Sequence, residues 1–225
     1  IVTLTYINNE GTIVTDKFGV SSIKYTYDSL GETASTKYYD INEQLTNNEQ
    51  KFAIIYAKFD MYGNIIELWY EDSDGKPCYD NKNRYRCVLT YDKNGCRTEI
   101  MNYGLDGNLS YCLDNYAIQR GKYDTKGRCI EVSYYDVNDK PCYINGNFSI
   151  ARSKYNSNDC VVEVSFFDDN DKPCIETKFG VHKHSYKYNE YNYLTEVCLF
   201  DEKGELTTSQ IYHFAKQELM YDNYH

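Results

Sequence analysis

Glutamates that recur at a fixed interval are the residues of this sequence best placed for chemistry. They are spaced 32 or 33 positions apart, at Glu67, Glu99, Glu131, Glu163 and Glu196. On one strand face, such a column would bind cations or supply catalytic carboxylates. The alternative is pairing across strands, with Arg120 and Arg152 near Glu131 and Glu163, each pair contributing roughly 0.2–1 kcal/mol. Because a carboxylate repeated five times belongs to the fold rather than to one active site, we favour pairing.

Metal binding is the second chemistry that residues of this sequence could support. The turns Asp72-Ser73-Asp74-Gly75 and Asp168-Asp169-Asn170-Asp171 are rich in carboxylates, yet they lack the bidentate glutamate of a calcium loop. His182 and His184, together with His213, would supply three nitrogen ligands, but no fourth ligand has a suitable spacing. We interpret the aspartates as turn formers and predict no metal site and no cofactor.

Catalytic motifs are missing from the sequence. It contains no nucleophile elbow, no Walker loop, no Rossmann glycine pattern and no recognisable Ser-His-Asp set. We therefore predict that the chain is not an enzyme and name no catalytic residue.

A row of aromatic residues is our candidate binding site. It consists of residues at one repeated position, namely Tyr39, Tyr103, Tyr135, Phe167 and Phe200. A neighbouring row contains Tyr38, Tyr70, Tyr134 and Phe166. Alternation along a strand places the two rows on opposite faces, the first outward and the second inward, and one of them should form core. A continuous exposed aromatic stripe would bind protein or glycan, whereas loops covering both rows would leave no binding surface.

The elements that position these residues are repeats of 32 residues. Lys-Pro-Cys occurs at Lys76-Pro77-Cys78, Lys140-Pro141-Cys142 and Lys172-Pro173-Cys174. In the repeat that lacks this motif, Asn108-Leu109-Ser110 stands at the equivalent position. Repeats of this length indicate a solenoid-like array in which each unit packs on its neighbours.

Each repeat contains two turn signals. The first is aromatic-Asp-x-x-Gly, as in Phe59-Asp60 with Gly63, and its last position drifts to Asp159 and Asn192. The second comes about sixteen residues later, at Gly11, Glu43, Gly75, Gly107, Asp139, Asp171 and Gly204. Both patterns are typical of turns that end in a left-handed residue.

Strands are predicted between the turns. Ile66, Leu68 and Tyr70 alternate with Ile65, Glu67 and Trp69, which indicates a half-buried strand. Segments 53–59, 85–91, 117–123 and 151–155 are the predicted hairpin partners. We also assign 211–220 as strand, by alignment of Phe214-Ala215 with Phe52-Ala53. The expected fold is all-β, an elongated array of about seven hairpin repeats over residues 1–225. The units begin near 6, 38, 70, 102, 134, 166 and 199, in what we interpret as a fragment of a longer protein.

The amino-acid composition limits the classes of partner that the chain can bind. The formal charge is −10, with 24 basic and 34 acidic residues, which argues against nucleic acid, and no apolar run is long enough to insert into a membrane. Tyrosine reaches 26 of 225 residues and suits a thin sheet, where rings pack and hydroxyls stay wet. Equivalent cysteines such as Cys142 and Cys174 should lie roughly 9–10 Å apart, which is too far for a disulfide. Nine unpaired thiols favour a cytoplasmic location, with the cell surface as the alternative.

Asp74-Gly75-Lys76-Pro77-Cys78, Tyr91-Asp92-x-x-Gly95 and Glu99 together resemble the tyrosine-rich bacterial "YD..GN..E..Y.D.DGKPC" repeats. The pattern is loosely similar to the YD repeats of RHS proteins and to MORN-like hairpin repeats, and it covers nearly the whole chain. This resemblance implies an all-β scaffold, shell or recognition surface beside other domains. It implies no activity and no functional residue.

We expect a non-catalytic scaffold that binds a protein partner through many small contacts. One alternative is a carbohydrate- or cell-envelope-binding module that uses the aromatic columns. The other is a structural spacer with no ligand.

Overall fold

The computed structural model describes residues 1–222, and among these residues it contains strands, turns and loops but no helix. The strands form one open antiparallel sheet, in which consecutive strands of the chain are hydrogen-bonded neighbours. The predicted all-β array of hairpins is therefore confirmed. The chain has two compact units, Ile1–Ile118 and Gln119–His225, which are described one at a time.

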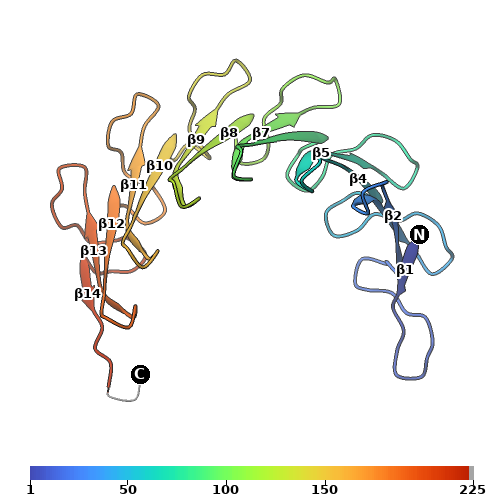
Figure 1. Cartoon of the computed structure of the whole chain (residues 1–225), viewed down its shortest axis with the longest axis horizontal. Helices are drawn as coiled ribbons and strands as arrows, with labels where there is room; N and C mark the ends of the chain where they lie inside the picture. Colours follow the sequence, from blue (N-terminus) through green and yellow to red (C-terminus); the bar gives the residue numbers. More distant parts are fainter. Residues whose placement is uncertain (223–225) are drawn as a thin grey trace. The chain divides into compact units, whose positions relative to one another are not determined.

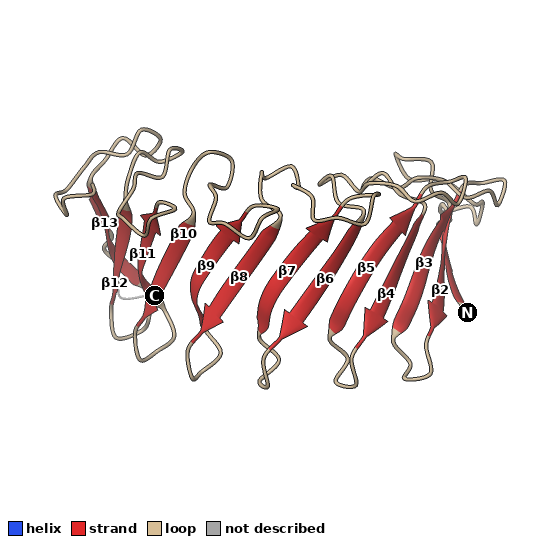
Figure 2. Cartoon of the chain, turned by 90° about the horizontal axis from the view of Figure 1, so that it is seen from above, coloured by secondary structure: helices blue, strands red, loops and turns tan. Residues whose placement is uncertain are grey.

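Unit 1 contains seven strands and the first residue of an eighth. Their bounds are β1 (Val2–Thr5), β2 (Ser22–Tyr27), β3 (Thr33–Tyr39), β4 (Ile54–Phe59), β5 (Ile65–Glu71), β6 (Arg86–Tyr91), β7 (Arg97–Tyr103) and β8 (Ile118–Tyr123). Unit 2 continues with β9 (Cys129–Tyr135), β10 (Ile150–Tyr155), β11 (Val161–Phe167), β12 (Lys183–Tyr188), β13 (Leu194–Phe200) and β14 (Lys216–Glu218). Within each unit the strands lie side by side (Figure 1), with short loops at one end of the strands and longer loops at the other end (Figure 2).

The short loops are the turns that the aromatic-Asp-x-x-Gly motif predicts. The Asp60 carboxylate accepts hydrogen bonds from the Tyr62 and Asn64 backbone N–H groups, at 2.8 and 2.9 Å. The fourth turn position is left-handed throughout, including where the glycine has drifted to Asp159 and Asn192. In the hairpins β2–β3, β4–β5, β6–β7, β10–β11 and β12–β13, the register shifts just before the aromatic residue that opens the turn.

The long loops contain the second predicted turn and also a third turn, which our sequence analysis missed. Left-handed residues mark it at Gly19, Lys51, Asn83, Asn115, Gly146, Gly180 and His213. Several copies open on an Asx residue, as at Asp80, whose carboxylate accepts hydrogen bonds from the Lys82 and Arg84 N–H groups. The sequence does contain a signal for this third turn, but the signal varies between repeats, because glycine occupies the left-handed site in few of the copies.

The Lys-Pro-Cys motif belongs to the second turn. Pro77, Pro141 and Pro173 each form an isolated bridge to the end of the preceding strand, and Leu109 does the same in the copy that lacks the motif. The Cys78 N–H donates to the Tyr70 carbonyl at 3.2 Å, and the Ser110 N–H donates to the Asn102 carbonyl at 2.9 Å. The backbone geometry thus survives the loss of the motif.

The tyrosine of the first turn connects neighbouring repeats. Its hydroxyl donates to the carbonyl at the start of the preceding odd-numbered strand, at 2.8–2.9 Å, in the pairs Tyr91–Ile65, Tyr155–Cys129, Tyr188–Val161 and Tyr221–Leu194. A neutral hydrogen bond of this kind contributes roughly 1 kcal/mol. The repeated tyrosine is therefore both a packing residue and a hydrogen-bond donor between repeats.

The two sheet faces differ in each unit. The aromatic face bears Tyr38 and Tyr70 in unit 1 and Tyr134 and Phe166 in unit 2, and third-turn residues pack onto it. The Phe52 ring lies between Tyr38 and Tyr70, with centroid distances of 6.0 and 4.7 Å. Phe148 lies in the same way between Tyr134 and Phe166. The charged face bears the glutamate column.

One strand prediction was wrong over most of its length. Of residues 211–220, only Lys216–Glu218 is strand. Ser209 opens a third turn instead, in which its side chain accepts hydrogen bonds from the Ile211 and Tyr212 N–H groups. The alignment of Phe214-Ala215 with Phe52-Ala53 is nevertheless correct, since both pairs directly precede a strand. Residues 1–222 include no helix with the length and hydropathy that a membrane crossing requires.

Candidate functional site

The glutamate column is a series of ion-pair clusters. Four of its five members each contact a lysine of their own hairpin and a cation of the next repeat. The pairs are Glu67 with Lys58 and Arg86, Glu131 with Lys122 and Arg152, Glu163 with Lys154 and Lys183, and Glu196 with Lys187 and Lys216. The predicted cross-strand pairing is confirmed. Since these four carboxylates are compensated by cations, they present no excess negative charge to a ligand.

The predicted partners were wrong in detail. Arg152 Nε lies 2.6 Å from Glu131 Oε2 rather than beside Glu163, and Arg120 Nη1 lies 2.7 Å from Asp139 Oδ1. The cause is the strand register. Lys154 is opposite Glu163, so Arg152 faces Ser165 on one side and Glu131 on the other. The pairing that we predicted assumes a four-residue hairpin loop, without the bulge that follows Lys154.

These ion pairs lower the pKa values of the glutamates. Lys187 and then Lys216 lower the pKa of Glu196 to about 2. Burial alone would raise the pKa values of Glu67 and Glu131, but the two cations beside each carboxylate outweigh it. All three carboxyl groups are therefore ionised at lower pH in the folded chain than in the unfolded chain.

Acidification should destabilise the protein through these groups. A folded pKa below the unfolded value of about 4.3 gives stability that is complete above that pH and is lost as the pH falls towards 2. We expect the melting temperature to fall steadily across this interval, as measured by circular dichroism. Glu196→Gln should flatten the fall, whereas Glu205→Gln, at an exposed turn residue, should leave it unchanged. Equal slopes for the two variants would contradict the assignment.

The predicted aromatic row lies on the charged face, where each ring is half-buried and has a cation over it. The distances from the cation to the ring centroid are 4.3–4.9 Å, in the pairs Lys24–Tyr39, Arg86–Tyr103, Arg120–Tyr135, Arg152–Phe167 and Lys183–Phe200. Such contacts contribute about 0.5–1 kcal/mol at exposed sites. The row is neither an open stripe nor a buried core, and its role in binding stays a prediction.

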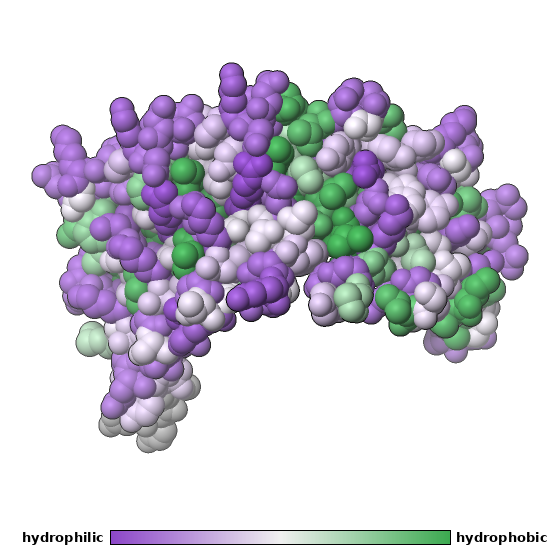
Figure 3. Space-filling view, turned by 45° about the horizontal axis from the view of Figure 1, so that its top comes forward, coloured by the Kyte–Doolittle hydropathy of each residue, from purple (hydrophilic) through white to green (hydrophobic). Residues whose placement is uncertain are grey.

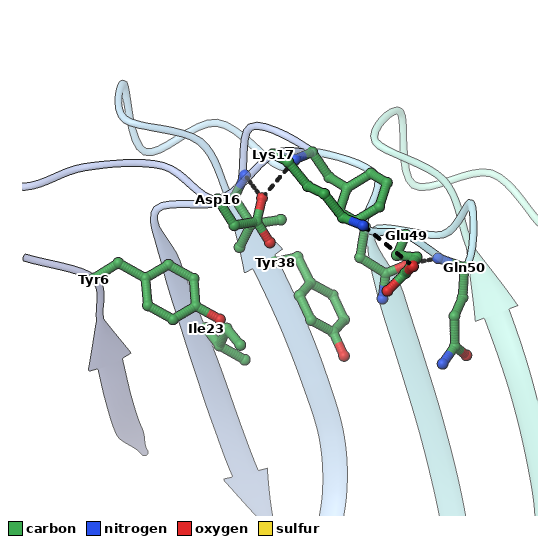
Figure 4. Close-up of a pocket in the computed structure, with 10 residues that line it drawn as sticks. Tyr6, Asp16, Lys17, Ile23, Tyr38, Glu49 and Gln50 are labelled. Atoms are coloured by element: carbon green, nitrogen blue, oxygen red, sulfur yellow. Dashed lines mark hydrogen bonds and ion pairs between the residues drawn. The ribbon is translucent and has the colours of Figure 1, made fainter.

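The aromatic face is more open where the third turn contributes a small residue. Phe52 and Phe148 fill the space between successive rings, but the equivalent positions 20 and 181 are valines, both fully buried. A hollow of about 330 Å³ lies beside Val20, between Tyr6 and Tyr38. Figure 4 shows the Tyr6, Ile23 and Tyr38 side chains entering it from the sheet, with Asp16, Lys17 and Glu49 on the loops above.

Unit 2 has the equivalent hollow, which is larger and more apolar. It measures about 450 Å³ and is lined by Val164, Phe166, Phe179, His184, Tyr186, Val197, Tyr212, Phe214 and Gln217. We call it the unit 2 pocket. Val181, Val197 and Leu199 form the buried cluster beneath it, with Phe179 and Phe214 packed against them. Phe179 stacks on Tyr212 at 5.1 Å and Tyr212 on Phe214 at 5.5 Å, so the third-turn rings form one wall.

His184 is a polar group in the apolar floor of this pocket. It is 7% exposed, and no described residue shares a hydrogen bond with its imidazole. Burial lowers its pKa, against a weaker opposing effect of Glu176, so the ring is neutral at pH 7. A neutral imidazole retains one donor and one acceptor. The pocket therefore combines aromatic walls with one hydrogen-bonding group.

The histidines and aspartates that we considered as metal ligands lie in separate surroundings. His182 Nδ1 lies 3.2 Å from the Cys174 carbonyl, His184 lines the unit 2 pocket, and His213 is a left-handed turn residue. The Asp72 and Asp168 carboxylates accept backbone N–H groups, which is the turn role we predicted. Residues 1–222 include no group of three or more His, Cys, Asp or Glu side chains able to hold a metal ion.

The cysteines form no disulfide in the described part of the chain, which includes all nine. Cys87, Cys112 and Cys198 are buried, as predicted for small apolar side chains, but those of the Lys-Pro-Cys motif are only half-buried. Burial raises the pKa values of Cys78 and Cys174 to about 11, which keeps both as thiols at neutral pH.

The unit 2 pocket was not predicted from the sequence. Phe179, Tyr212 and Phe214 lie in the third turns, which we had not recognised as a repeated element. Surface hydropathy does not reveal a single dominant site either, because apolar patches alternate with hydrophilic side chains on the face drawn in Figure 3. The sequence feature that indicates the pocket is Val181, in the repeat column where Phe52 and Phe148 stand in other repeats.

Comparison with known proteins gives distant likenesses. No family model matches the chain, and no curated protein matches it. Among solved structures, that of TcdB2–TccC3–Cdc42 has a TM-score of 0.42 at 11% identity, covering 90% of this chain and 10% of that one. TcdB2–TccC3 without its hypervariable C-terminal region has a TM-score of 0.31 at 12% identity, covering 91% and 12%. With scores below 0.5, these matches support no argument about function, and the resemblance to YD repeats rests on the sequence motifs.

Proposed function

We propose that this chain is a non-catalytic repeat scaffold that binds a protein partner, and that the unit 2 pocket receives the partner's main anchoring side chain. The observation that supports this best is the combination in the pocket of apolar and aromatic walls with the buried His184 imidazole. Binding pockets are typically apolar hollows with a few polar groups that fix orientation. A large side chain with a polar end, such as tyrosine, matches this chemistry.

The ring geometry favours protein over glycan. Sugars stack on open ring faces, but Phe179, Tyr212 and Phe214 stack on one another at interplanar angles of 20° and 16°. The ring faces that they share are therefore occupied. On the opposite sheet face, the cations over the predicted aromatic row likewise cover its rings.

The test is selection of a phage-displayed random peptide library on the immobilised chain, followed by fluorescence anisotropy with the selected peptides. We expect peptides that share one large aromatic or aliphatic residue. Tyr212→Ser should weaken them roughly thirtyfold, the effect of losing an interface hot spot. The matched control is Tyr62→Ser, because Tyr62 is 81% exposed and far along the chain in unit 1.

The other outcomes would overturn the proposal. Loss of binding in Tyr103→Ser/Tyr135→Ser/Phe167→Ser, but not in Tyr212→Ser, would move the site to the predicted aromatic row. Binding to a glycan array without any peptide would favour the carbohydrate alternative. The absence of any ligand in both assays would favour a spacer.

A further inference from the structure

The imidazole of His184 gives the unit 2 pocket a chemical selectivity. We propose that His184 makes this pocket bind an aromatic ring that ends in a neutral hydroxyl group, so that it takes tyrosine in preference to phenylalanine. This inference rests on the proposed function and deepens it, since it names the group that the pocket recognises and the residue that recognises it.

Apolar side chains surround His184 on the protein side. Across the sheet, His184 is paired with Val164 of β11 and with Leu199 of β13. The rings of Phe166 and Phe179 meet the imidazole edge to face, at centroid distances of 6.0 and 5.5 Å. These four neighbours hold the imidazole in one orientation and offer its nitrogen atoms no hydrogen bond.

Two residues with polar groups lie nearby, but neither pairs with the imidazole. Tyr186 stacks on it at 6.3 Å and forms no hydrogen bond with it. The Glu176 carboxylate accepts hydrogen bonds from Asn147 Nδ2 at 2.7 Å and from the Phe179 N–H at 2.8 Å, so both of its oxygens are already engaged.

His182 provides a contrast within the same repeat. It is 8% exposed, and its Nδ1 lies 3.2 Å from the Cys174 carbonyl, which gives it a hydrogen-bond partner inside the protein. His184 is buried to the same degree, at 7% exposed, but lines the pocket without a partner among the described residues. Because buried polar groups are normally paired, the group that pairs with His184 has to come from the pocket side.

Packing of the sheet does not require a histidine at this position. Ile23 and Ile55 occupy the equivalent position in β2 and β4, each opposite a ring of the next strand. Ile23 also lines the equivalent hollow of unit 1. The array thus accepts an apolar residue here, and the polar group at position 184 is a property of the unit 2 pocket rather than of the fold.

A hydroxyl group matches this imidazole better than other polar groups do. The imidazole is neutral at pH 7 and offers one donor and one acceptor, and a hydroxyl can pair with either. A carboxylate or an ammonium group would lose its hydration in an apolar hollow, at a high cost. A ring without a polar end would displace solvent from the imidazole and leave a buried donor or acceptor unpaired.

Titration of the whole chain with p-cresol and with toluene, the side-chain analogues of tyrosine and phenylalanine, tests the proposal. Amide shifts in NMR spectra at neutral pH give the two dissociation constants. We expect the ratio of p-cresol to toluene affinity to be roughly tenfold higher in the wild-type chain than in His184→Ile. His213→Asn is the matched control, because it removes an imidazole from an exposed turn position where Asn83 and Asn115 stand in other repeats.

A conservative variant separates hydrogen bonding from packing. His184→Gln keeps a donor and an acceptor, and glutamine is already the residue at the equivalent position of β8, Gln119. It should therefore retain part of the preference for p-cresol that His184→Ile loses. Circular dichroism checks that each variant folds.

Three results would overturn the selectivity: equal affinity ratios in the wild-type chain and His184→Ile, an equal fall of the ratio in His213→Asn, or no binding of p-cresol to the wild-type chain. Failure of the proposed function has a different signature. Selected peptides that depend on Tyr212, without a preference for p-cresol, would leave the proposed function intact and overturn only the role of His184. A preference for p-cresol without any selected peptide would support the role of His184 and overturn the protein partner.

Discussion

Phe52→Ala should lower the free energy of unfolding by about 3–5 kcal/mol, the usual cost of emptying a buried aromatic site. The ring is 2% exposed, stacks on Tyr70 at 4.7 Å and meets Tyr38 edge to face at 6.0 Å. Each aromatic pair contributes about 0.5–1.5 kcal/mol beyond the buried area. In a sheet with one layer, no second layer can collapse into the space. Urea unfolding followed by circular dichroism measures the loss.

Phe18 provides the comparison for this prediction. It also belongs to a third turn but is 38% exposed, so Phe18→Ala should cost less than about 1 kcal/mol. Phe52→Val should fall between the two alanine variants, because valine is the residue at positions 20 and 181. That variant should also open a hollow like the one beside Val20. A loss below about 1 kcal/mol for Phe52→Ala would show that the ring column does not stabilise the array.

Arg84→Leu should also be strongly destabilising, by about 3 kcal/mol, because it leaves a buried carboxylate without its counter-ion. The Asp80 side chain is 1% exposed, and its Oδ2 accepts Arg84 Nε at 3.0 Å and Nη2 at 2.7 Å. Arg84 occupies the column that holds Phe52 in the previous repeat, so here an ion pair replaces a ring. Since the arginine is itself 29% exposed, we place the cost at the lower end of the range for buried pairs.

A double-mutant cycle separates the pair from its two members. Asp80→Asn/Arg84→Leu should recover most of the stability that Arg84→Leu loses, because the asparagine keeps the turn hydrogen bonds without a buried charge. Equilibrium unfolding in urea gives the four free energies. If the double variant is as unstable as the single one, arginine packing rather than charge compensation stabilises this repeat.

The sequence was sufficient for most of the local structure. The spacing of Lys-Pro-Cys and of aromatic-Asp-x-x-Gly predicted the repeat, and alternation such as Ile66, Leu68 and Tyr70 predicted the strands. These features depend on residues close together in the chain, since a turn needs its Asp and its left-handed residue within four positions. For the same reason, the first two turns were predictable even where Glu43 or Asp139 replaces glycine.

The side-chain contacts of the candidate site were harder to predict from the sequence than the turns and strands. Alternation correctly placed Tyr135 and Phe167 on the face opposite Tyr134 and Phe166, but it could not show that Arg120 and Arg152 cover their rings. The partner of each charge depends on a bulge of one residue, and a shift of one position changes every cross-strand neighbour. The third turns, which provide Phe179 and Tyr212, have a variable length and few glycines.

By itself, the sequence determined an all-β repeat array with an acidic and tyrosine-rich composition, because periodicity and turn chemistry are local properties. Only the tertiary structure decided which residues meet across strands. It placed two cations around four of the five glutamates of the column, packed third-turn rings onto the aromatic face and left a pocket where Val181 replaces a ring. Contacts between residues about thirty positions apart depend on register and side-chain volume, and these become definite only when the repeats pack against one another.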